Sequence, residues 1–298
     1  MNSVLPAAKF EFFTATDGNH GRGVAWAAKR LGQKSVVHMP KGSTKTRFDN
    51  IEREGAQVTI EEVNYDDCVR MAAAEAAQTE HGVVVQDTAW DGYEEIPSWI
   101  MQGYGSMASE AAEQLRQIGV NRPTHVFVQA GVGSLAGAVV GYFTNLFPNA
   151  PPKFVVAEAA AADCLYRGAA VGDGKPRIVG GDLQTIMAGL ACGEPNTISW
   201  DILRNHATAF TSCPDWVSAK GMRMLASPVK GDPSVISGES GAVTSGLLAA
   251  IMLFDEYRAL RDVLGLDKNS QVLLFSTEGD TDPEKYRKIV WDGEYPSV

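Results

Sequence analysis

The stretch TATDGNHGRG, residues 14–23, places an acid, an amide and an imidazole among three glycines directly after an apolar run. Turns commonly need a glycine or an asparagine, but they seldom combine both with an acid and a histidine at the start of a helix. Glycines expose backbone amides, and the start of a helix favours an anion. The combination predicts that this segment holds a ligand.

A second segment, QAGVGSLAG over residues 129–137, has the chemistry of a phosphate site. Glycines let the backbone approach an oxyanion, and the N–H groups of a following helix point at it. The same letters satisfy GxGxxA through Gly131, Gly133 and Ala136, and Glu158 ends the next expected strand. That pattern is the dinucleotide fingerprint, loosely spaced, so a phosphate site and a nicotinamide site are both open at this point.

Parallel βαβ units must position these loops, because β-rich runs alternate with helical patterns along the chain. The expected strands are 10–16, 35–40, 57–62, 83–87, 125–130, 153–159 and 271–277. The expected helices lie near 20–31, 45–54, 65–79, 98–118, 135–146, 215–226 and 242–261. Residues 160–210 have poor periodicity and many glycines, which predicts a covering loop or part of a site. Crossover rules favour an α/β fold with doubly wound parallel sheets divided between two lobes.

Strand ends carry the unusual residues. Ligands of open parallel sheets bind beyond the carboxyl ends of the strands. Four clusters fall at such ends: TDGNHG, QDTAWDGY, QAGVGSLAG and STEGDTD. A glycine turn alone can serve only backbone geometry, and Asp87 could simply cap the turn before Thr88. Four clusters together favour a functional site over four unrelated turns.

Composition excludes several classes of protein. The 298 residues are 45% apolar and 21% charged, which is typical of a soluble globular enzyme. The longest apolar tract, SGLLAAIMLF over 245–254, is about half the ~20 residues that a bilayer requires. A net charge of −10 without a basic, aromatic-rich run argues against nucleic acid. Neither a membrane nor a nucleic-acid partner is expected.

The cysteines and histidines give no sign of a metal or a disulfide framework. His38, His81, His125 and His206 have no partner at metal-ligand spacing. No CxxC pair occurs, and the opening MNSVLPAAKFEFF lacks the pattern of a signal peptide. We therefore expect a cytoplasmic protein without a metal and with free thiols, although Cys192 and Cys213 could form a local redox pair. The cysteines are Cys68, Cys164, Cys192 and Cys213.

A family resemblance rests on seven segments in chain order: TDGNHGRGVAWAA, VVQDTAWDGY, IPSWIMQGY, QAGVGSLAG, TIMAGLACGEP, SGESGAV and STEGDTD. They resemble the diaminopropionate ammonia-lyases, pyridoxal-phosphate enzymes of the tryptophan synthase β-like fold (fold type II). The likeness covers almost the entire chain. TDGNHGRG and STEGDTD distinguish this family from threonine deaminases and O-acetylserine sulfhydrylases, whose loops resemble SxGNH and PSxGE. The resemblance implies pyridoxal 5'-phosphate as cofactor, a small amino-acid substrate and a homodimer.

Roles for the first two clusters follow from the resemblance. Asn19 matches the asparagine that contacts the phenolic oxygen of the cofactor. The loop that holds the substrate carboxylate through its backbone amides corresponds to Thr16, Gly18 and His20. Asp17 and Asp87 match two bases, one on each face of the substrate, and a positioned base is worth ~10²–10⁴-fold. Two such bases would let both D and L isomers react.

The resemblance also assigns the last two clusters. The phosphate cup corresponds to Gly131, Val132, Gly133 and Ser134. Thr277 matches the hydroxyl that faces the pyridine nitrogen, where a neutral group in place of a carboxylate favours elimination. The implied reaction is α,β-elimination of ammonia from 2,3-diaminopropionate, which gives pyruvate and a second ammonia. The implied lobes are a small one, 1–103, with the asparagine loop, and a large cofactor-phosphate lobe, 104–298.

The lysine that binds the cofactor in this family precedes the TDGNHG loop, on an N-terminal helix, whereas this sequence begins sixteen residues before Asp17. Lys9 is too close to the first strand to replace it. We therefore expect the sequence to lack the N-terminal part of the fold, and the chain as written to bind pyridoxal phosphate weakly, without a covalent bond and with almost no activity. Borohydride reduction and peptide mapping test this: a pyridoxyl adduct on one stoichiometric lysine, with pyruvate release, would contradict it.

Three hypotheses follow from the sequence. The first is an ammonia-lyase chain, and the second is an NAD-dependent oxidoreductase based on GxGxxA. The third is a lysine-less remnant of the fold that binds a cofactor or partner without catalysis. A dehydrogenase leaves the asparagine loop and STEGD unexplained, while the first and third hypotheses share every motif.

Overall fold

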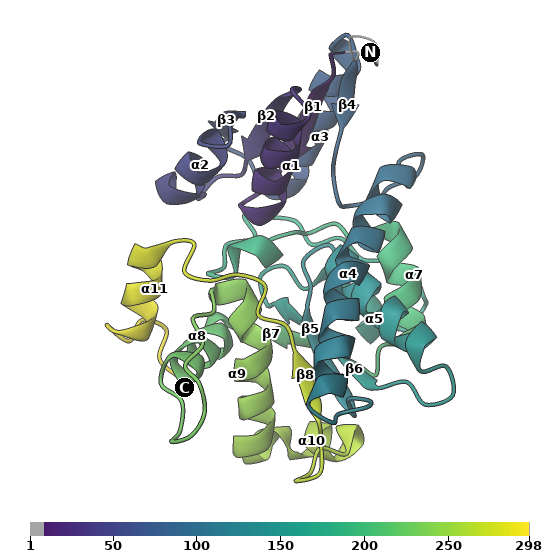
Figure 1. Cartoon of the computed structure of the whole chain (residues 1–298), viewed down its shortest axis with the longest axis vertical. Coiled ribbons are helices and arrows are strands. Elements are labelled where there is room, and N and C mark those ends of the chain that lie inside the picture. The colour runs from purple at the N-terminus through teal and green to yellow at the C-terminus, as the bar shows by residue number, and fades with distance from the viewer. Residues whose placement is uncertain (1–8, 298) are drawn as a thin grey trace. The chain divides into compact units, whose positions relative to one another are not determined.

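Two compact units, Met1–Asp87 and Thr88–Val298, make up the chain in the computed structural model, which describes residues 9–297. Each unit contains a four-stranded parallel sheet with helices on both faces (Figure 1). The α/β architecture with parallel sheets, predicted from the alternation of strand and helix patterns, is confirmed.

The small unit, residues 9–87 as described, has the strand order β3-β2-β1-β4. Its strands are β1 (Glu11–Ala15), β2 (Lys34–Met39), β3 (Gln57–Ile60) and β4 (Gly82–Val84), and its helices are α1 (Asn19–Arg30), α2 (Lys45–Glu52) and α3 (Tyr65–Gln78). Val37 and Met39 pack with α1 and α2 residues, whereas Val36 and Phe13 pack with α3. Alternate residues of a strand face opposite sides, so this sheet is covered on both.

The large unit has the strand order β7-β6-β5-β8. Its strands are β5 (His125–Gln129), β6 (Lys153–Ala159), β7 (Ala209–Cys213) and β8 (Val272–Leu274). Its α-helices are α4 (Glu95–Gln117), α5 (Ser134–Leu146), α6 (Cys164–Val171), α7 (Thr197–His206), α8 (Asp215–Ala226), α9 (Glu239–Leu253), α10 (Arg258–Leu264) and α11 (Pro283–Val290). Two short 3-10 helices, η1 (Ala188–Leu190) and η2 (Asp255–Tyr257), complete it.

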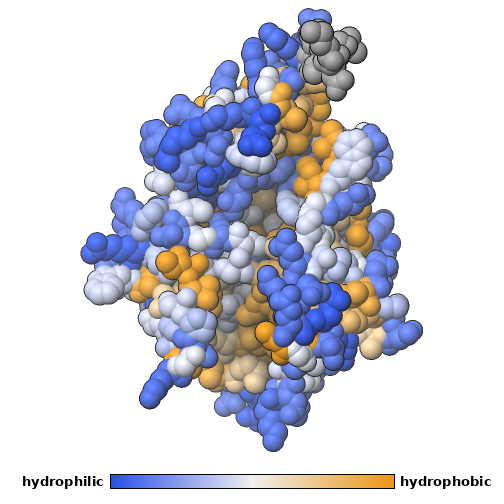
Figure 2. Space-filling model, in the orientation of Figure 1, coloured by the Kyte–Doolittle hydropathy of each residue, from blue (hydrophilic) through white to orange (hydrophobic). Residues whose placement is uncertain are grey.

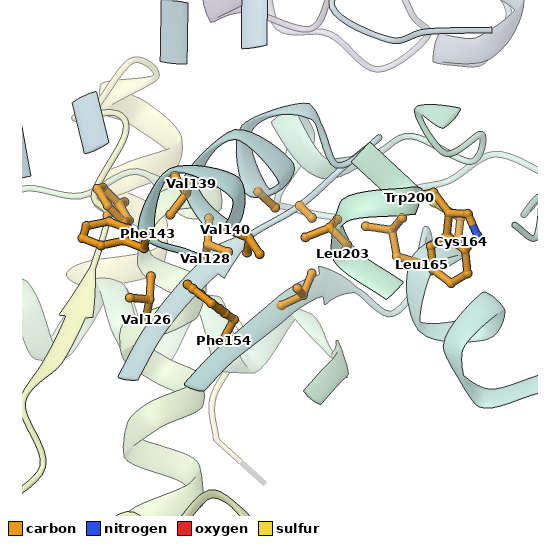
Figure 3. Packing of buried hydrophobic residues seen from close by; sticks show 14 of the residues in the cluster. Val126, Val128, Val139, Val140, Phe143, Phe154, Cys164, Leu165, Trp200 and Leu203 are labelled. Atoms are coloured by element: carbon orange, nitrogen blue, oxygen red, sulfur yellow. The ribbon is translucent and has the colours of Figure 1, made fainter. Parts of the chain in front are cut away.

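Hydrophobic residues on both faces of the central strands form the core of the large unit. Val126 and Val128 of β5 point into one cluster with α5 and α7 residues, which Figure 3 shows from close by. Phe127, between them in sequence, belongs to a second cluster with α8 and α9. Each fully buried side chain of this size contributes roughly 1.5–3 kcal/mol. The apolar run VFV in β5, residues 126–128, is therefore the sequence of a strand that is buried on both sides.

Several expected elements differ from the observed ones. Residues 160–210 are not a simple covering loop, because they contain α6, η1 and α7 and reach the start of β7. The expected helix 242–261 begins earlier, at Glu239, and ends at Leu253, since Phe254 has extended backbone angles (φ −102°, ψ 129°). The strand β7 and the helix α11 were not expected at all.

The boundary between the units also differs from the expected one at residues 103 and 104. The chain divides between Asp87 and Thr88. Helix α4 spans the expected boundary without interruption and packs along α5 of the large unit. A helix is a single rigid element, so a division within it would separate residues that move together.

Hydrophilic residues cover much of the face shown in Figure 2, and hydrophobic ones form separate, smaller patches. Within the described residues, no helix has the length and apolar character that crossing a membrane requires.

Candidate active site

Each sheet has one point at which its strand order changes direction. In each sheet, the predicted clusters follow the two strands that meet at that point. In the small unit the chain runs from β1 through β2 to β3, and β4 then pairs with the other side of β1. In the large unit β8 pairs in the same way with β5. Ligands of open α/β sheets bind at such switch points. TDGNHG and Gln86–Asp87 follow β1 and β4, while QAGVG and STEGD follow β5 and β8.

Asp17 follows β1 and is held by two side chains that sequence analysis did not single out. The guanidinium of Arg47, on α2, donates to one carboxylate oxygen, and the hydroxyl of Ser43 donates to the other. The side chains of Arg47 and Asp17 are only 6% and 9% exposed. Paired and shielded from water, the carboxylate has a fixed direction. Arg47 lies in an otherwise polar helix and carries no sequence signal that separates it from a surface arginine.

The side chain of Gln86 extends the sheet between β1 and β4. Its Oε1 accepts the Ala15 N–H at 2.8 Å and its Nε2 donates to the Ala15 carbonyl at 3.2 Å, as a neighbouring peptide group would. The same Nε2 also lies 3.3 Å from Oδ1 of Asp87. Gln86 is fully buried. The amide of Gln86 thus connects the end of β1, which leads to Asp17, with Asp87, the residue directly after Gln86.

Thr16 and Gly18 lie in the turn between β1 and α1, and Asn19 and His20 are the first two residues of α1. The Gly18 N–H donates to Oγ1 of Thr16 at 2.9 Å, which shapes the turn after β1. Asn19 is the exposed first residue of the helix. His20 Nε2 donates to the Val85 carbonyl at 2.8 Å, because a carbonyl can only accept. His20 therefore joins α1 to the end of β4, and its role toward a substrate stays a prediction.

The loop Gly131–Ser134 leads from β5 into the 13-residue helix α5. Asn196 fixes it: its N–H donates to the Val132 carbonyl and its Nδ2 to Ser134 Oγ, both at 2.8 Å. The Oδ1 of Asn196 meanwhile caps α7 by accepting the N–H groups of Ile198 and Ser199. Sequence analysis assigned Asn196 to an irregular region and missed this function.

The residues of this loop fit a bound phosphate ester. Gly133 has φ +102°, and a Cβ there would lie 2.9 Å from Ser199 Oγ, so a larger residue would disturb the loop. The first N–H groups of a helix have no partner within it, and the first turn of α5 contains no acidic residue. Backbone donors, the helix dipole and the Ser134 hydroxyl therefore suit an external dianion such as the phosphate of pyridoxal phosphate.

Thr277 lies beyond β8 and is contacted by Gln129, the last residue of β5. Gln129 Nε2 donates to the Phe275 carbonyl at 3.1 Å and to Thr277 Oγ1 at 2.8 Å. An uncharged hydroxyl next to the phosphate loop fits the neutral partner that the ring nitrogen of pyridoxal phosphate would need.

Glu158, the acid that would complete a dinucleotide fingerprint, has a structural function instead. Its two carboxyl oxygens accept the N–H groups of Leu165 and Tyr166 at 2.8 and 2.7 Å, in the first turn of α6. The side chain is fully buried, and burial raises the pKa of this carboxyl well above 4.5 although the two backbone hydrogen bonds oppose the rise. Glu158 therefore cannot bind the ribose of a dinucleotide, so the nicotinamide hypothesis lacks the acidic residue that its fingerprint requires.

The raised pKa of Glu158 predicts a pH dependence of stability. As pH rises past 4.5, the unfolded chain loses a proton that the folded protein retains, so the free energy of unfolding should fall with pH until the folded-state pKa is reached. Glu158→Gln should remove this component and, because an amide accepts only one of the two N–H groups, cost roughly 1–3 kcal/mol at acidic pH. Denaturant titrations at several pH values, with the exposed Asp201→Asn as control, measure both effects; an unchanged pH profile in Glu158→Gln would contradict the assignment.

The described cysteines, including Cys192 and Cys213, are buried and form no disulfide. Burial raises the pKa of the Cys213 thiol to about 12, which disfavours the thiolate needed for disulfide exchange. Within residues 9–297, no group of three or more His, Cys, Asp and Glu side chains could hold a metal ion.

Comparison with known proteins shows which family the chain resembles. Residues 6–257 match the family described as pyridoxal-phosphate dependent enzyme. Diaminopropionate ammonia-lyase of Escherichia coli strain K12 is 53% identical over 288 residues, which are 96% of this chain and 71% of that protein. The one of Salmonella typhimurium strain LT2 is 55% identical over 283 residues, 95% and 70% of the two chains. The crystal structure of the E. coli enzyme in complex with an aminoacrylate-PLP azomethine reaction intermediate has a TM-score of 0.89 at 52% identity, covering 96% and 72%.

Two parallel sheets, each with one change of winding direction, together with the family match, define the class as a pyridoxal-phosphate dependent enzyme of fold type II. Within this class, the chain belongs to the diaminopropionate ammonia-lyase family. The resemblance predicted from the seven segments is confirmed, and the comparisons favour neither alternative hypothesis.

Proposed function

We propose that this protein is a carbon-nitrogen lyase that converts 2,3-diaminopropionate and water into pyruvate and two molecules of ammonia, with pyridoxal 5'-phosphate as cofactor. The observation that carries the proposal is the identity of 53% with diaminopropionate ammonia-lyase over 96% of the chain. When bound, pyridoxal phosphate supplies an electron sink that makes the substrate Cα–H bond acidic.

The large unit is proposed to hold the cofactor. Its phosphate would bind the N–H groups of the loop from Gly131 through Val132 and Gly133 to Ser134, at the start of α5. Thr277 would supply the uncharged hydroxyl for the ring nitrogen. The hydrogen bond from Asn196 to Ser134 and the one from Gln129 to Thr277 hold these two hydroxyls in place before any ligand binds.

The small unit is proposed to remove and return protons. Asp17 and Asp87 would each accept the Cα proton from one face of the substrate, which would let either enantiomer react. Asn19 would contact the phenolic oxygen of the cofactor, and the loop Thr16–His20 would hold the substrate carboxylate through its amides. The buried position of Asp17, with its direction fixed by Arg47 and Ser43, supports its assignment as a base.

Pyruvate release from the D and L enantiomers of 2,3-diaminopropionate tests the proposal directly. The natural protein that contains this sequence, loaded with pyridoxal phosphate, should release pyruvate from at least one enantiomer far faster than it releases 2-oxobutyrate from L-threonine. Stoichiometric ammonia, two per pyruvate, should accompany it. Faster turnover of L-threonine, or pyruvate with only one ammonia, would refute the substrate assignment.

We also propose a cytoplasmic homodimer without nucleic-acid or membrane partners. The net charge of −10 and the buried cysteines without disulfides support this setting. Light scattering of the purified protein measures the mass of the assembly.

A further inference from the structure

The imidazole of His38, a residue of β2, lies between two carboxylates in the small unit. Its Nδ1 is 3.1 Å from Thr59 Oγ1 and 3.1 Å from Glu61 Oε1, and its Nε2 is 2.9 Å from Glu75 Oε2. Thr59 belongs to β3, Glu61 follows that strand directly, and Glu75 is on α3. The His38 side chain is only 7% exposed, so its ring nitrogens depend on these partners rather than on water.

The acceptors around the ring determine where its hydrogen atoms are. The Thr59 hydroxyl lies 2.6 Å from Glu61 Oε1 and donates its only hydrogen to that carboxylate. Nδ1 faces the oxygens of both residues, and neither has a hydrogen left for it, so Nδ1 must donate. Nε2 faces the Glu75 carboxylate, which can only accept, so Nε2 must donate as well. An imidazole with a hydrogen on both nitrogens carries a positive charge.

The two carboxylates depend on this charge. Within residues 9–297, the ion pairs of Glu61 and Glu75 are with His38, and none is with a lysine or an arginine. The hydrogen bond from Thr59 lowers the pKa of the Glu61 carboxyl, burial opposes this effect, and the bond and charge of His38 lower the pKa further. Glu61 is therefore ionised at neutral pH and needs a cation beside it.

The other titratable groups near Glu61 supply no cation. Cys68 lies on the buried face of α3, and burial raises the pKa of its thiol to about 12. The charges of Glu61, Asp67 and Asp66 act in the same direction. The thiol is thus neutral and the two aspartates are negative, so neither can take the place of the His38 ring.

The proton on His38 controls whether α3 stays bound to β2. Removal of either ring hydrogen would set a nitrogen lone pair against a carboxylate oxygen at a buried position, which is repulsive. Glu61 would keep the bond from Thr59, whereas the Glu75 side chain, which is 46% exposed, could turn into water. Helix α3 would then lose this bond to the sheet.

We infer that His38 is a pH-sensitive ionic link of the small unit, which joins α3 to β2 and to the end of β3 while its ring is protonated and releases α3 in alkaline solution. The link adjoins the candidate site, because the His38 carbonyl accepts the Thr16 N–H at 3.0 Å and Thr16 precedes Asp17. A group that binds its proton more tightly in the folded state stabilises that state at lower pH, and this stabilisation is lost as the pH rises. The inference concerns the charges of the small unit alone and does not depend on the proposed reaction.

Nuclear magnetic resonance of the full chain with 15N-labelled histidine tests the inference, because the ring nitrogens of an imidazolium and of a neutral imidazole differ in chemical shift. The His38 ring signals are identified by their connection to its backbone. At about pH 7, where an unperturbed histidine is mostly neutral, both nitrogens of His38 should carry hydrogen. A neutral His38 ring at that pH would overturn the inference.

Glu75→Gln removes one of the two negative charges at a half-exposed position, so the proton affinity of His38 should fall roughly tenfold. The matched control is an exposed pair in the same unit: His81 Nε2 lies 3.9 Å from Glu80 Oε1, and the two side chains are 55% and 93% exposed. Glu80→Gln should hardly change the proton affinity of His81, since water screens that pair.

Denaturant unfolding measures the strength of the link. Between neutral and alkaline pH, the free energy of unfolding should fall more in the wild type than in His38→Gln, which has no ring proton to lose. Equal pH profiles of these two proteins, or equal proton affinity of His38 in the wild type and in Glu75→Gln, would also overturn the inference.

Discussion

In a form of the protein that contains the cofactor-binding lysine, Asp17→Asn and Asp87→Asn are each expected to slow the turnover of one enantiomer of 2,3-diaminopropionate by ~10²–10⁴-fold and to affect the other enantiomer much less. Each carboxylate is proposed to accept the Cα proton from a different face of the substrate. A variant that lacks one carboxylate can therefore still remove the proton from the other face. The measurement is kcat/KM for pyruvate release from D and from L substrate in each variant.

The structure adds a necessary control to this experiment. Asparagine at position 17 removes a charge that balances the buried Arg47, so Asp17→Asn can also weaken the small unit. A loss of folded protein reduces both rates equally, whereas a lost base changes their ratio. Equal losses for both enantiomers in both variants would rule out the two-base assignment.

Arg47→Met is expected to lower the free energy of unfolding of the small unit by roughly 3–5 kcal/mol, since it leaves the Asp17 carboxylate buried and without its charge partner. The double variant Arg47→Met with Asp17→Asn should recover part of that loss, because no uncompensated charge then remains. Denaturant unfolding measures the stability. Arg47→Met should also reduce turnover of the same enantiomer that Asp17→Asn reduces.

Arg22→Met is the matched control for Arg47→Met. Arg22 pairs with Glu54 in the same unit, but its side chain is 56% exposed. Exposed pairs contribute only about 0–1 kcal/mol, so this variant should be nearly as stable as the wild type. Equal stability of Arg22→Met and Arg47→Met would show that the Asp17 pair is not shielded from water.

Much of the fold could be predicted because its strands are buried on both faces. The runs VFV in β5 and FVV in β6 are apolar and rich in β-branched valine, which is typical of strands in a parallel sheet that is covered on both faces. The strand AFTSC of β7 was missed, since its threonine and serine give no such run. Helix α11 did have a signal, with Asp282 as its cap and Pro283 at its first position, and this signal was overlooked.

For the candidate site, the sequence predicts the loops but not the residues that orient the side chains in them. Glycines and polar residues after strands indicate where a ligand binds, and sheet topology then brings the loops together in pairs. The residues that orient the functional groups are distant in sequence: Arg47 lies 30 positions from Asp17, and Gln129 lies 148 positions from Thr277. Such contacts arise from tertiary packing, and a single sequence contains no periodicity that reveals them.

The amide of Gln86 has a consequence for engineering the enzyme. Hydrogen bonds between the main chains of neighbouring strands persist through almost any substitution. The two hydrogen bonds at Ala15 are instead made by the side chain of Gln86, so changing that one residue removes them. A library at position 86 would therefore alter how the segments leading to Asp17 and Asp87 are joined while both acids stay in the chain. Selection from such a library for one mirror-image substrate offers a route to enantiomer-specific catalysts that leaves the phosphate loop untouched.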